Sequence, residues 1–117
     1  MKYLLLIHLN NERWDELSTA EQQEIYSAHD GFQAATKESG ELVGYAALRG
    51  PEATVTVRER GGVRTVTDGP YLEAKEYFAG YYLVDTDTRE RAVELAGWLR
   101  ETKVSAVEVR PLMGDSL

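Results

Sequence analysis

The chain has 117 residues, of which 43% are hydrophobic and 28% charged, and these values predict one folded globular domain over residues 1–117. It contains no cysteine, which excludes disulfides, thiolate chemistry and cysteine-ligated zinc. Thirteen Lys and Arg against twenty Asp and Glu give a net charge of −7, so the sequence predicts no nucleic-acid partner.

The first predicted element is a strand over residues 2–9, ended by the turn-prone pair Asn10-Asn11. Its apolar run is too short for a signal-peptide core, and a membrane span needs roughly 20 apolar residues. We therefore expect a cytoplasmic protein that makes no contact with a membrane.

A helix is predicted next, over about residues 18–38. Ser18 and Glu21 have the spacing of a capping box, and Gly40 is placed to end the helix. Apolar side chains at spacings of three and four form a single stripe made of Ile25, Ala28, Phe32 and Ala35.

The second half of the chain is predicted to be mostly strands. These cover residues 41–49, 53–60, 63–67, 77–85 and 105–110, and a helix with Thr86, Asp87 and Thr88 as caps runs to about residue 102. Gly61-Gly62 joins the second and third of these strands as a hairpin, and Asp68-Gly69-Pro70 forms a further turn.

The order β-α-β, inserted hairpin, β-α-β predicts an α+β fold. It is the pattern of a ferredoxin-like βαββαβ sandwich with both helices on one face of the sheet. In that topology the strands over residues 2–9 and 77–85 are central, and they are also the two most apolar segments of the chain.

These two central strands do not alternate between apolar and polar residues. Leu5 and Ile7 point to one face while Leu4 and Leu6 point to the other, so both faces of the sheet are apolar. Two helices cover one face only. Either the inserted hairpin folds over the second face or a second protomer packs against it, and we favour the homodimer.

His29 is the main candidate for proton chemistry. It lies at the edge of the helical stripe, where an imidazole can face a cleft beside the sheet, and its type of side chain suits a general acid or base. The alternative is a solvated surface histidine. A metal site of two histidines and a carboxylate would need both His29 and His8, and nothing in their spacing demands it, so no metal is predicted.

Two other candidates have strong structural explanations. His8 ends a central strand, where it either joins a site or bonds to backbone at the edge of the core. Asp68 belongs to a turn, and its carboxylate either only stabilises that turn or orients a histidine.

Aromatic and basic residues allow two interpretations each. Tyr45 and the other tyrosines near the sheet either line a pocket or fill a dimer core. Arg49 and the arginines around the hairpin either bind an anionic ligand or pair with Glu52 and Glu59.

The stretch from Asp68-Gly69-Pro70-Tyr71 to Glu76 resembles the DGPF-type branch of the YCII-related family, with Tyr71 in place of the phenylalanine of the motif. The proline expected near the end of the second helix is absent. The resemblance covers nearly the whole chain, and its other parts are Gly80-Tyr81-Tyr82-Leu83-Val84, Val107-Glu108-Val109-Arg110-Pro111, the opening strand with Trp14, Gly40, and Thr54-Val55-Thr56-Val57-Arg58.

This resemblance implies a ferredoxin-like fold that dimerises into an α+β barrel, and a His-Asp pair in a cleft, which here would be His29 and Asp68. The leading hypothesis is a cofactor-free homodimer that performs hydrolysis, isomerisation or elimination on a small, anionic organic molecule. Tyr45, Arg49 and His8 would position the ligand. The alternatives are a non-catalytic module that senses a ligand or assists another protein, and a purely structural dimer.

Overall fold

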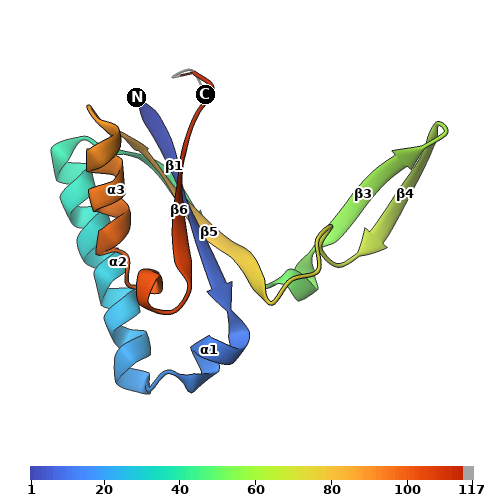
Figure 1. Ribbon diagram of the computed structural model, residues 1–117, viewed down its shortest axis with the longest axis horizontal. Coiled ribbons are helices and arrows are strands. Elements are labelled where there is room, and N and C mark those ends of the chain that lie inside the picture. Colours follow the sequence, from blue (N-terminus) through green and yellow to red (C-terminus); the bar gives the residue numbers. More distant parts are fainter. Residues whose placement is uncertain (115–117) are drawn as a thin grey trace.

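The computed structural model describes residues 1–114 (Figure 1). In chain order the elements are β1 (Lys2–Asn10), α1 (Asn11–Glu16), α2 (Thr19–Ser39), β2 (Leu42–Ala47), the 3-10 turn η1 (Pro51–Ala53), β3 (Val55–Arg60), β4 (Val63–Asp68), β5 (Glu76–Asp85), α3 (Arg89–Trp98), the 3-10 turn η2 (Arg100–Lys103) and β6 (Ala106–Pro111). None of the described helices is long and apolar enough to cross a bilayer.

Within residues 1–114 the main sheet has four antiparallel strands in the order β2-β5-β1-β6. Helices α2 and α3 lie together on one face of it (Figure 1). This is the predicted ferredoxin-like α+β fold, and the two most apolar strands, β1 and β5, are central as expected.

The core lies between the two helices and the face of the sheet that they cover. Leu5 of β1 and Val84 of β5 are fully buried there, against Leu95 of α3 and the nearly buried Phe32 of α2. Because strand side chains alternate, β1 sends every second residue, Tyr3, Leu5 and Ile7, into this core.

The other face of the sheet carries no helix of the described chain. Leu4 and Leu6 of β1 point to it, opposite Leu83 and Tyr81 of β5, as the sequence predicts. Phe78, also on this face, is 39% exposed. An apolar sheet face therefore remains open to solvent in a single chain.

Strands β3 and β4 form a separate two-stranded sheet, joined by Gly61-Gly62. Both glycines have positive φ, 53° and 79°, the conformation that a two-residue hairpin turn of this hand requires. The hairpin projects away from the main sheet instead of folding over its open face (Figure 1). The radius of gyration is 16.2 Å accordingly, against about 13 Å for a compact chain of this length.

Several elements differ from those predicted. Asn10 caps the short helix α1 where a turn was expected, because its side-chain oxygen accepts hydrogen bonds from the backbone amides of Glu12 and Arg13. Ala53 belongs to η1, so the strand predicted over residues 53–60 begins at Val55. Strand β2 is shorter at both ends than residues 41–49. Helix α3 ends at Trp98, since Leu99 adopts an extended conformation, and the chain resumes as the tighter turn η2.

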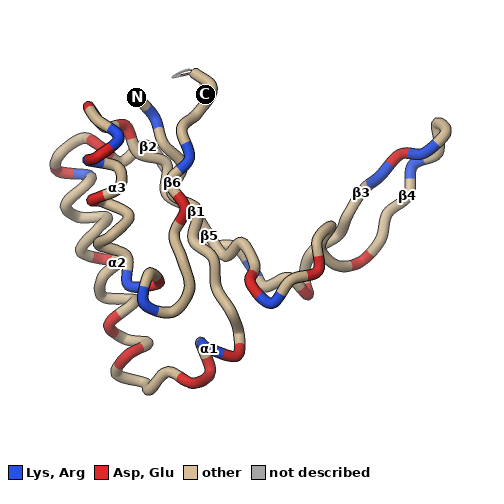
Figure 2. Tube along the Cα trace, viewed as in Figure 1, with Lys and Arg blue, Asp and Glu red and all other residues tan. Residues whose placement is uncertain are grey.

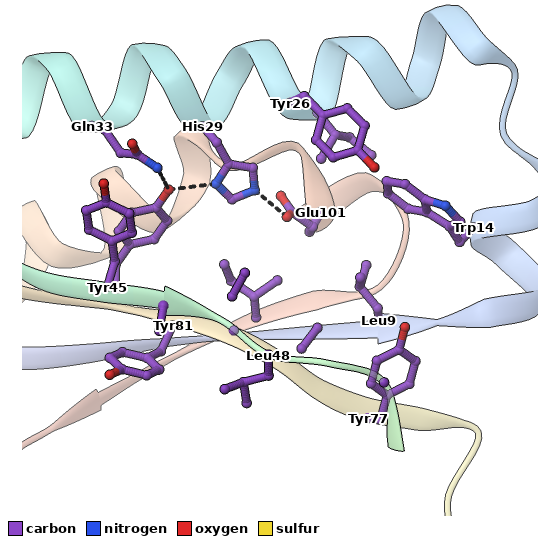
Figure 3. Close-up of a pocket in the computed structure, with 18 of the residues that line it drawn as sticks. Leu9, Trp14, Tyr26, His29, Gln33, Tyr45, Leu48, Tyr77, Tyr81 and Glu101 are labelled. Atoms are coloured by element: carbon purple, nitrogen blue, oxygen red, sulfur yellow. Dashed lines mark hydrogen bonds and ion pairs between the residues drawn. The ribbon is translucent and has the colours of Figure 1, made fainter. Parts of the chain in front are cut away.

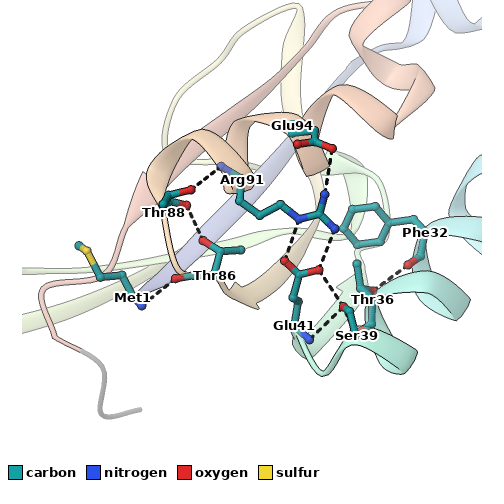
Figure 4. Close-up of polar contacts among 9 residues, drawn as sticks. All are labelled: Met1, Phe32, Thr36, Ser39, Glu41, Thr86, Thr88, Arg91 and Glu94. Atoms are coloured by element: carbon teal, nitrogen blue, oxygen red, sulfur yellow. Dashed lines mark hydrogen bonds and ion pairs between the residues drawn. The ribbon is translucent and has the colours of Figure 1, made fainter.

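A cluster of polar contacts joins α3 to the chain before β2 (Figure 4). The guanidinium of Arg91 donates to both carboxylate oxygens of Glu41, from Nε at 2.9 Å and from Nη2 at 3.0 Å. This ion pair holds the pKa of the Glu41 carboxyl below its ordinary value. The pair fixes α3 beside the end of α2, and α2 carries the side chains of the site.

Candidate functional site

A cavity of about 470 Å³ lies between α2 and the main sheet (Figure 3). Aromatic side chains supply much of its wall, and they come from α1, α2, β2 and β5. Those that line it are Trp14, Tyr26, Tyr45, Tyr77 and Tyr82, and the polar side chains beside them are His29, Asp30, Gln33 and Glu101. Tyr81 also borders the cavity, but its ring lies on the open face of the sheet with Phe78.

An irregularity in β5 shapes the floor of this cavity. The pairing of β1 with β5 shifts between Ile7 and His8, so that Ile7 lies opposite Gly80 but His8 lies opposite Phe78. The extra residue reverses the alternation of β5, as a β-bulge does. Tyr77 is thereby brought to the cavity side, whereas Phe78 goes to the open face with His8.

A chain of hydrogen bonds links α2, β5 and η2 at the polar end of the cavity (Figure 3). Nε2 of His29 lies 2.5 Å from Oε2 of Glu101, and Nδ1 lies 2.7 Å from the hydroxyl of Tyr82. The side-chain amide of Gln33 donates to the same hydroxyl oxygen at 3.0 Å.

A neutral His29 satisfies these contacts with one arrangement of protons. Because Gln33 donates to the Tyr82 oxygen, the Tyr82 hydroxyl proton is available for Nδ1 of His29, and Nε2–H then donates to the Glu101 carboxylate. Every nitrogen of the imidazole has a partner in this tautomer. The carboxylate fixes both the orientation and the tautomer of His29, as an orienting acid does beside a general base.

The surroundings keep Tyr82 protonated. Burial raises the pKa of the Tyr82 hydroxyl, the hydrogen bond from Gln33 opposes this, and the negative charges of Glu101 and Asp30 raise the pKa further. Tyr82 therefore remains a donor to His29 over the physiological range.

Glu101 is the most unusual group of the site. Its side chain is 6% exposed, and its second oxygen, Oε1, is buried without a hydrogen-bond partner among the described residues. An acceptor left unpaired in the interior is unfavourable for folding.

The arrangement is suited to moving protons. When the Tyr82 oxygen takes up a proton, its original hydroxyl proton can pass to Nδ1 of His29, so that Tyr82 stays neutral. The imidazolium so formed lies against the Glu101 carboxylate, which stabilises its charge.

The structure brings together two of the five site residues expected from the sequence, His29 and Tyr45, whose ring lies 5.4 Å from that of Tyr82. Asp68 ends β4 at the base of the projecting hairpin and is not among the residues that line the cavity. Arg49 lines a neighbouring cavity beside η1. His8 pairs with Glu108 and lies near Phe78 on the open face of the sheet.

His8 and His29 thus lie on opposite faces of the sheet. Within residues 1–114, no group of three or more His, Asp or Glu side chains is placed to hold a metal ion.

Sequence reasoning missed Glu101, Gln33 and the role of Tyr82. Gln33 lies four residues after His29, so helical spacing alone places it on the same face of α2. Nothing comparable indicates Glu101, because it belongs to η2, where the 3.6-residue period of α3 no longer applies.

Two comparisons with known proteins bear on this site. The family model of the YCII-related domain matches residues 1–114. A protein of Rhizobium meliloti (strain 1021), described as uncharacterized, is 31% identical over 114 residues, which make up 96% of this chain and 92% of that protein.

Proposed function

The chain belongs to the YCII-related family, and within that family we propose that it is a cytoplasmic homodimer that binds a small organic molecule and transfers protons through His29. The motif Asp68-Gly69-Pro70-Tyr71 supports its assignment to the DGPF-type branch. The reaction would be a hydrolysis, isomerisation or elimination that depends on proton transfer.

The observation that carries the proposal is the hydrogen-bonded chain Glu101–His29–Tyr82 at the end of an aromatic cavity. A histidine fixed by a buried carboxylate and bonded to a hydroxyl is the arrangement by which proteins relay protons. In this proposal Glu101 takes the orienting role that the sequence assigns to Asp68, and Tyr45 helps to position the ligand.

The experiment uses solvent deuterium, because the substrate is not known. Pools of small organic acids, amines, ketones and phenols are incubated with the protein in D₂O, and ¹H NMR follows protein-dependent exchange or conversion. We expect at least one compound to react with the wild type, and His29→Gln to reduce its rate about 100-fold or more. Glu38→Gln, an exposed change on the same helix, should leave the rate unchanged.

A compound that reacts equally fast with His29→Gln would remove His29 from the mechanism. Circular dichroism of the variant, compared with the wild type, establishes that it remains folded.

One observation favours a second candidate function, a ligand-sensing module without catalysis. Both ring nitrogens of His29 are already hydrogen-bonded, so neither is free to accept a proton directly from a ligand. A module would bind a compound without converting it, and His29→Gln would then alter affinity alone. Binding measured alongside the exchange experiment separates the two functions.

The homodimer is supported by the open sheet face and by the hairpin. Val55, Val57 and Val66 share one face of the hairpin, and each is between 58% and 62% exposed. A two-stranded hairpin alone is only marginally stable in water. A second copy that packs on the open face would lie on the side to which the hairpin projects (Figure 1).

The distribution of charge along the chain also favours a second copy of this chain as the partner. The hairpin carries Arg58, Arg60 and Arg64 against two acidic residues, whereas the whole chain has a net charge of −7 (Figure 2). The acidic excess therefore lies outside the hairpin. A basic hairpin that reaches onto an acidic second copy is electrostatically complementary to it.

Sedimentation equilibrium at micromolar concentration tests the dimer. We expect a dimer for the wild type and for Thr65→Glu, which changes the opposite face of the hairpin, and a shift to monomer for Val57→Glu. A wild type that is strictly monomeric would contradict the proposal.

A further inference from the structure

We propose that the ligand of the cavity is a small organic cation, an amine carried on an apolar or aromatic body. This rests on the proposed function, in that the cavity is taken to be a ligand site, and it goes further by stating the charge of the ligand. It replaces the anionic ligand expected from the sequence.

The charged groups at the cavity are all of one sign. Asp30 and Glu101 line it, and among the described residues that line it none is a lysine or an arginine. Asp30 is exposed and has no ion-pair partner in residues 1–114, so its charge is not neutralised by a neighbour. An anion that entered the cavity would meet repulsion from both carboxylates, whereas a cation would be attracted.

Arg49 does not offset this charge. It lines the adjacent cavity with Pro51 and Pro70, at the base of the hairpin, and not the cavity that contains His29. The expectation of an anionic ligand depended on arginines near the hairpin, and the fold separates them from the histidine.

Hydrogen-bonding capacity points to the same class of ligand. The Tyr82 proton is directed to His29 and the Nε2 proton to Glu101, so neither is available to a ligand. The carboxylate of Asp30 is an accessible acceptor with a full charge, whereas the free donors of the lining, the second N–H of Gln33 and the hydroxyls of Tyr26 and Tyr45, are neutral. An ammonium group would therefore gain a charge-assisted hydrogen bond here, and a carboxylate would meet neutral donors only.

The walls are suited to a cation as well. The ring of Trp14 lies 5.9 Å from that of Tyr26 in an edge-to-face arrangement, and Tyr45 lies 5.4 Å from Tyr82. All four rings line the cavity. Aromatic faces attract an organic cation through their quadrupoles and also accept an apolar body (Figure 3).

The experiment compares three probes of the same shape that differ in charge: 3-phenylpropylamine, 3-phenyl-1-propanol and 3-phenylpropionate. Their dissociation constants for the full chain are measured at pH 7 by saturation-transfer NMR or by isothermal titration calorimetry. We expect the amine to bind about tenfold more tightly than the alcohol, and the carboxylate to bind most weakly.

Two variants separate the cavity from the overall charge of the protein. Asp30→Asn and Glu38→Gln both remove one negative charge from α2, but only Asp30 lines the cavity. We expect Asp30→Asn to weaken amine binding about fivefold and Glu38→Gln to leave it unchanged.

The outcomes distinguish the two proposals. Tighter binding of the carboxylate, or equal effects of the two variants, would overturn the cationic ligand while leaving the cavity as a ligand site. If none of the three probes bound even at millimolar concentration, the cavity itself would be lost as a ligand site, and the proposed function would fail with it.

Discussion

Replacing Glu101 with leucine should leave the stability of the fold nearly unchanged and abolish proton transfer. The side chain is 6% exposed, and one of its carboxylate oxygens has no partner in the described chain. A buried carboxylate that is only half satisfied contributes little net stability, and this offsets the cost of leaving His29 without its partner. In the proposed function the role of Glu101 is to orient His29.

The magnitude follows from four contributions to the free energy of unfolding. Glu101→Leu removes the hydrogen bond to His29, worth about 1.5–3 kcal/mol, and leaves Nε2–H of His29 without an acceptor, which costs about 1–3 kcal/mol more. It also removes the unfavourable burial of an unpaired oxygen, about 1–3 kcal/mol, and adds apolar volume to a buried position, about 1.5 kcal/mol. The balance lies within about 1 kcal/mol of zero, which corresponds to a change in the unfolding temperature of no more than about 4 °C.

Urea denaturation followed by circular dichroism provides the assay, with deuterium exchange as the functional readout. Glu38→Leu is the control, because Glu38 is exposed and its replacement should change stability by less than about 0.5 kcal/mol. A loss of more than about 2 kcal/mol in Glu101→Leu would show that the carboxylate anchors the fold, and the reasoning about an orienting role would be wrong.

Three further predictions concern groups around the site. Tyr82→Phe should lose less stability above pH 10 than the wild type does. The pKa of Tyr82 is raised in the fold, so its contribution to the free energy of unfolding is complete below the ordinary pKa of 10.0 and declines as the pH rises further. Urea denaturation of both proteins at pH 8 and pH 11 tests this, and an equal decline in the two would contradict it. Since the pKa of Glu41 is lowered by Arg91, the stability of the wild type should fall more steeply below pH 4.5 than that of Glu41→Gln. At pH 7 the variant should melt a few degrees lower than the wild type. Scanning calorimetry checks both, and an unchanged melting temperature at pH 7 would show that the ion pair does not stabilise the fold. Asp68→Asn should leave amine binding within about twofold of the wild type, since Asp68 does not line the cavity; a tenfold loss in calorimetry would return Asp68 to the site.

The sequence predicts the body of the fold because its local patterns agree with one another. The capping box of Ser18 and Glu21, the apolar stripe that contains Phe32 and the two apolar central strands all favour the same βαββαβ order. The absence of alternation in β1 also predicts correctly that both faces of the sheet are apolar. Such features depend on neighbours in sequence, which are visible without a structure.

The site is less predictable because it depends on two local irregularities. The bulge in β5 decides that Tyr77 faces the cavity and Phe78 does not. The extended conformation of Leu99 ends α3 and sets the direction in which Glu101 points toward His29. Neither event has a signature in the 2-residue or 3.6-residue period from which strands and helices are predicted.

The Asp68-Gly69-Pro70 turn lies at the base of the hairpin, and Asp68 is not among the residues that line the His29 cavity. Gly69 has a φ of 96°, a value that side chains disfavour, and its amide donates to the carbonyl oxygen of Thr54 at 2.7 Å while its own carbonyl accepts from the Thr56 hydroxyl. These contacts close the base of the hairpin and fix the direction in which it leaves the sheet. The turn is thus proposed to act through the hairpin, on which the proposed dimer depends, whereas the proposed proton transfer within one chain rests on His29 and Glu101.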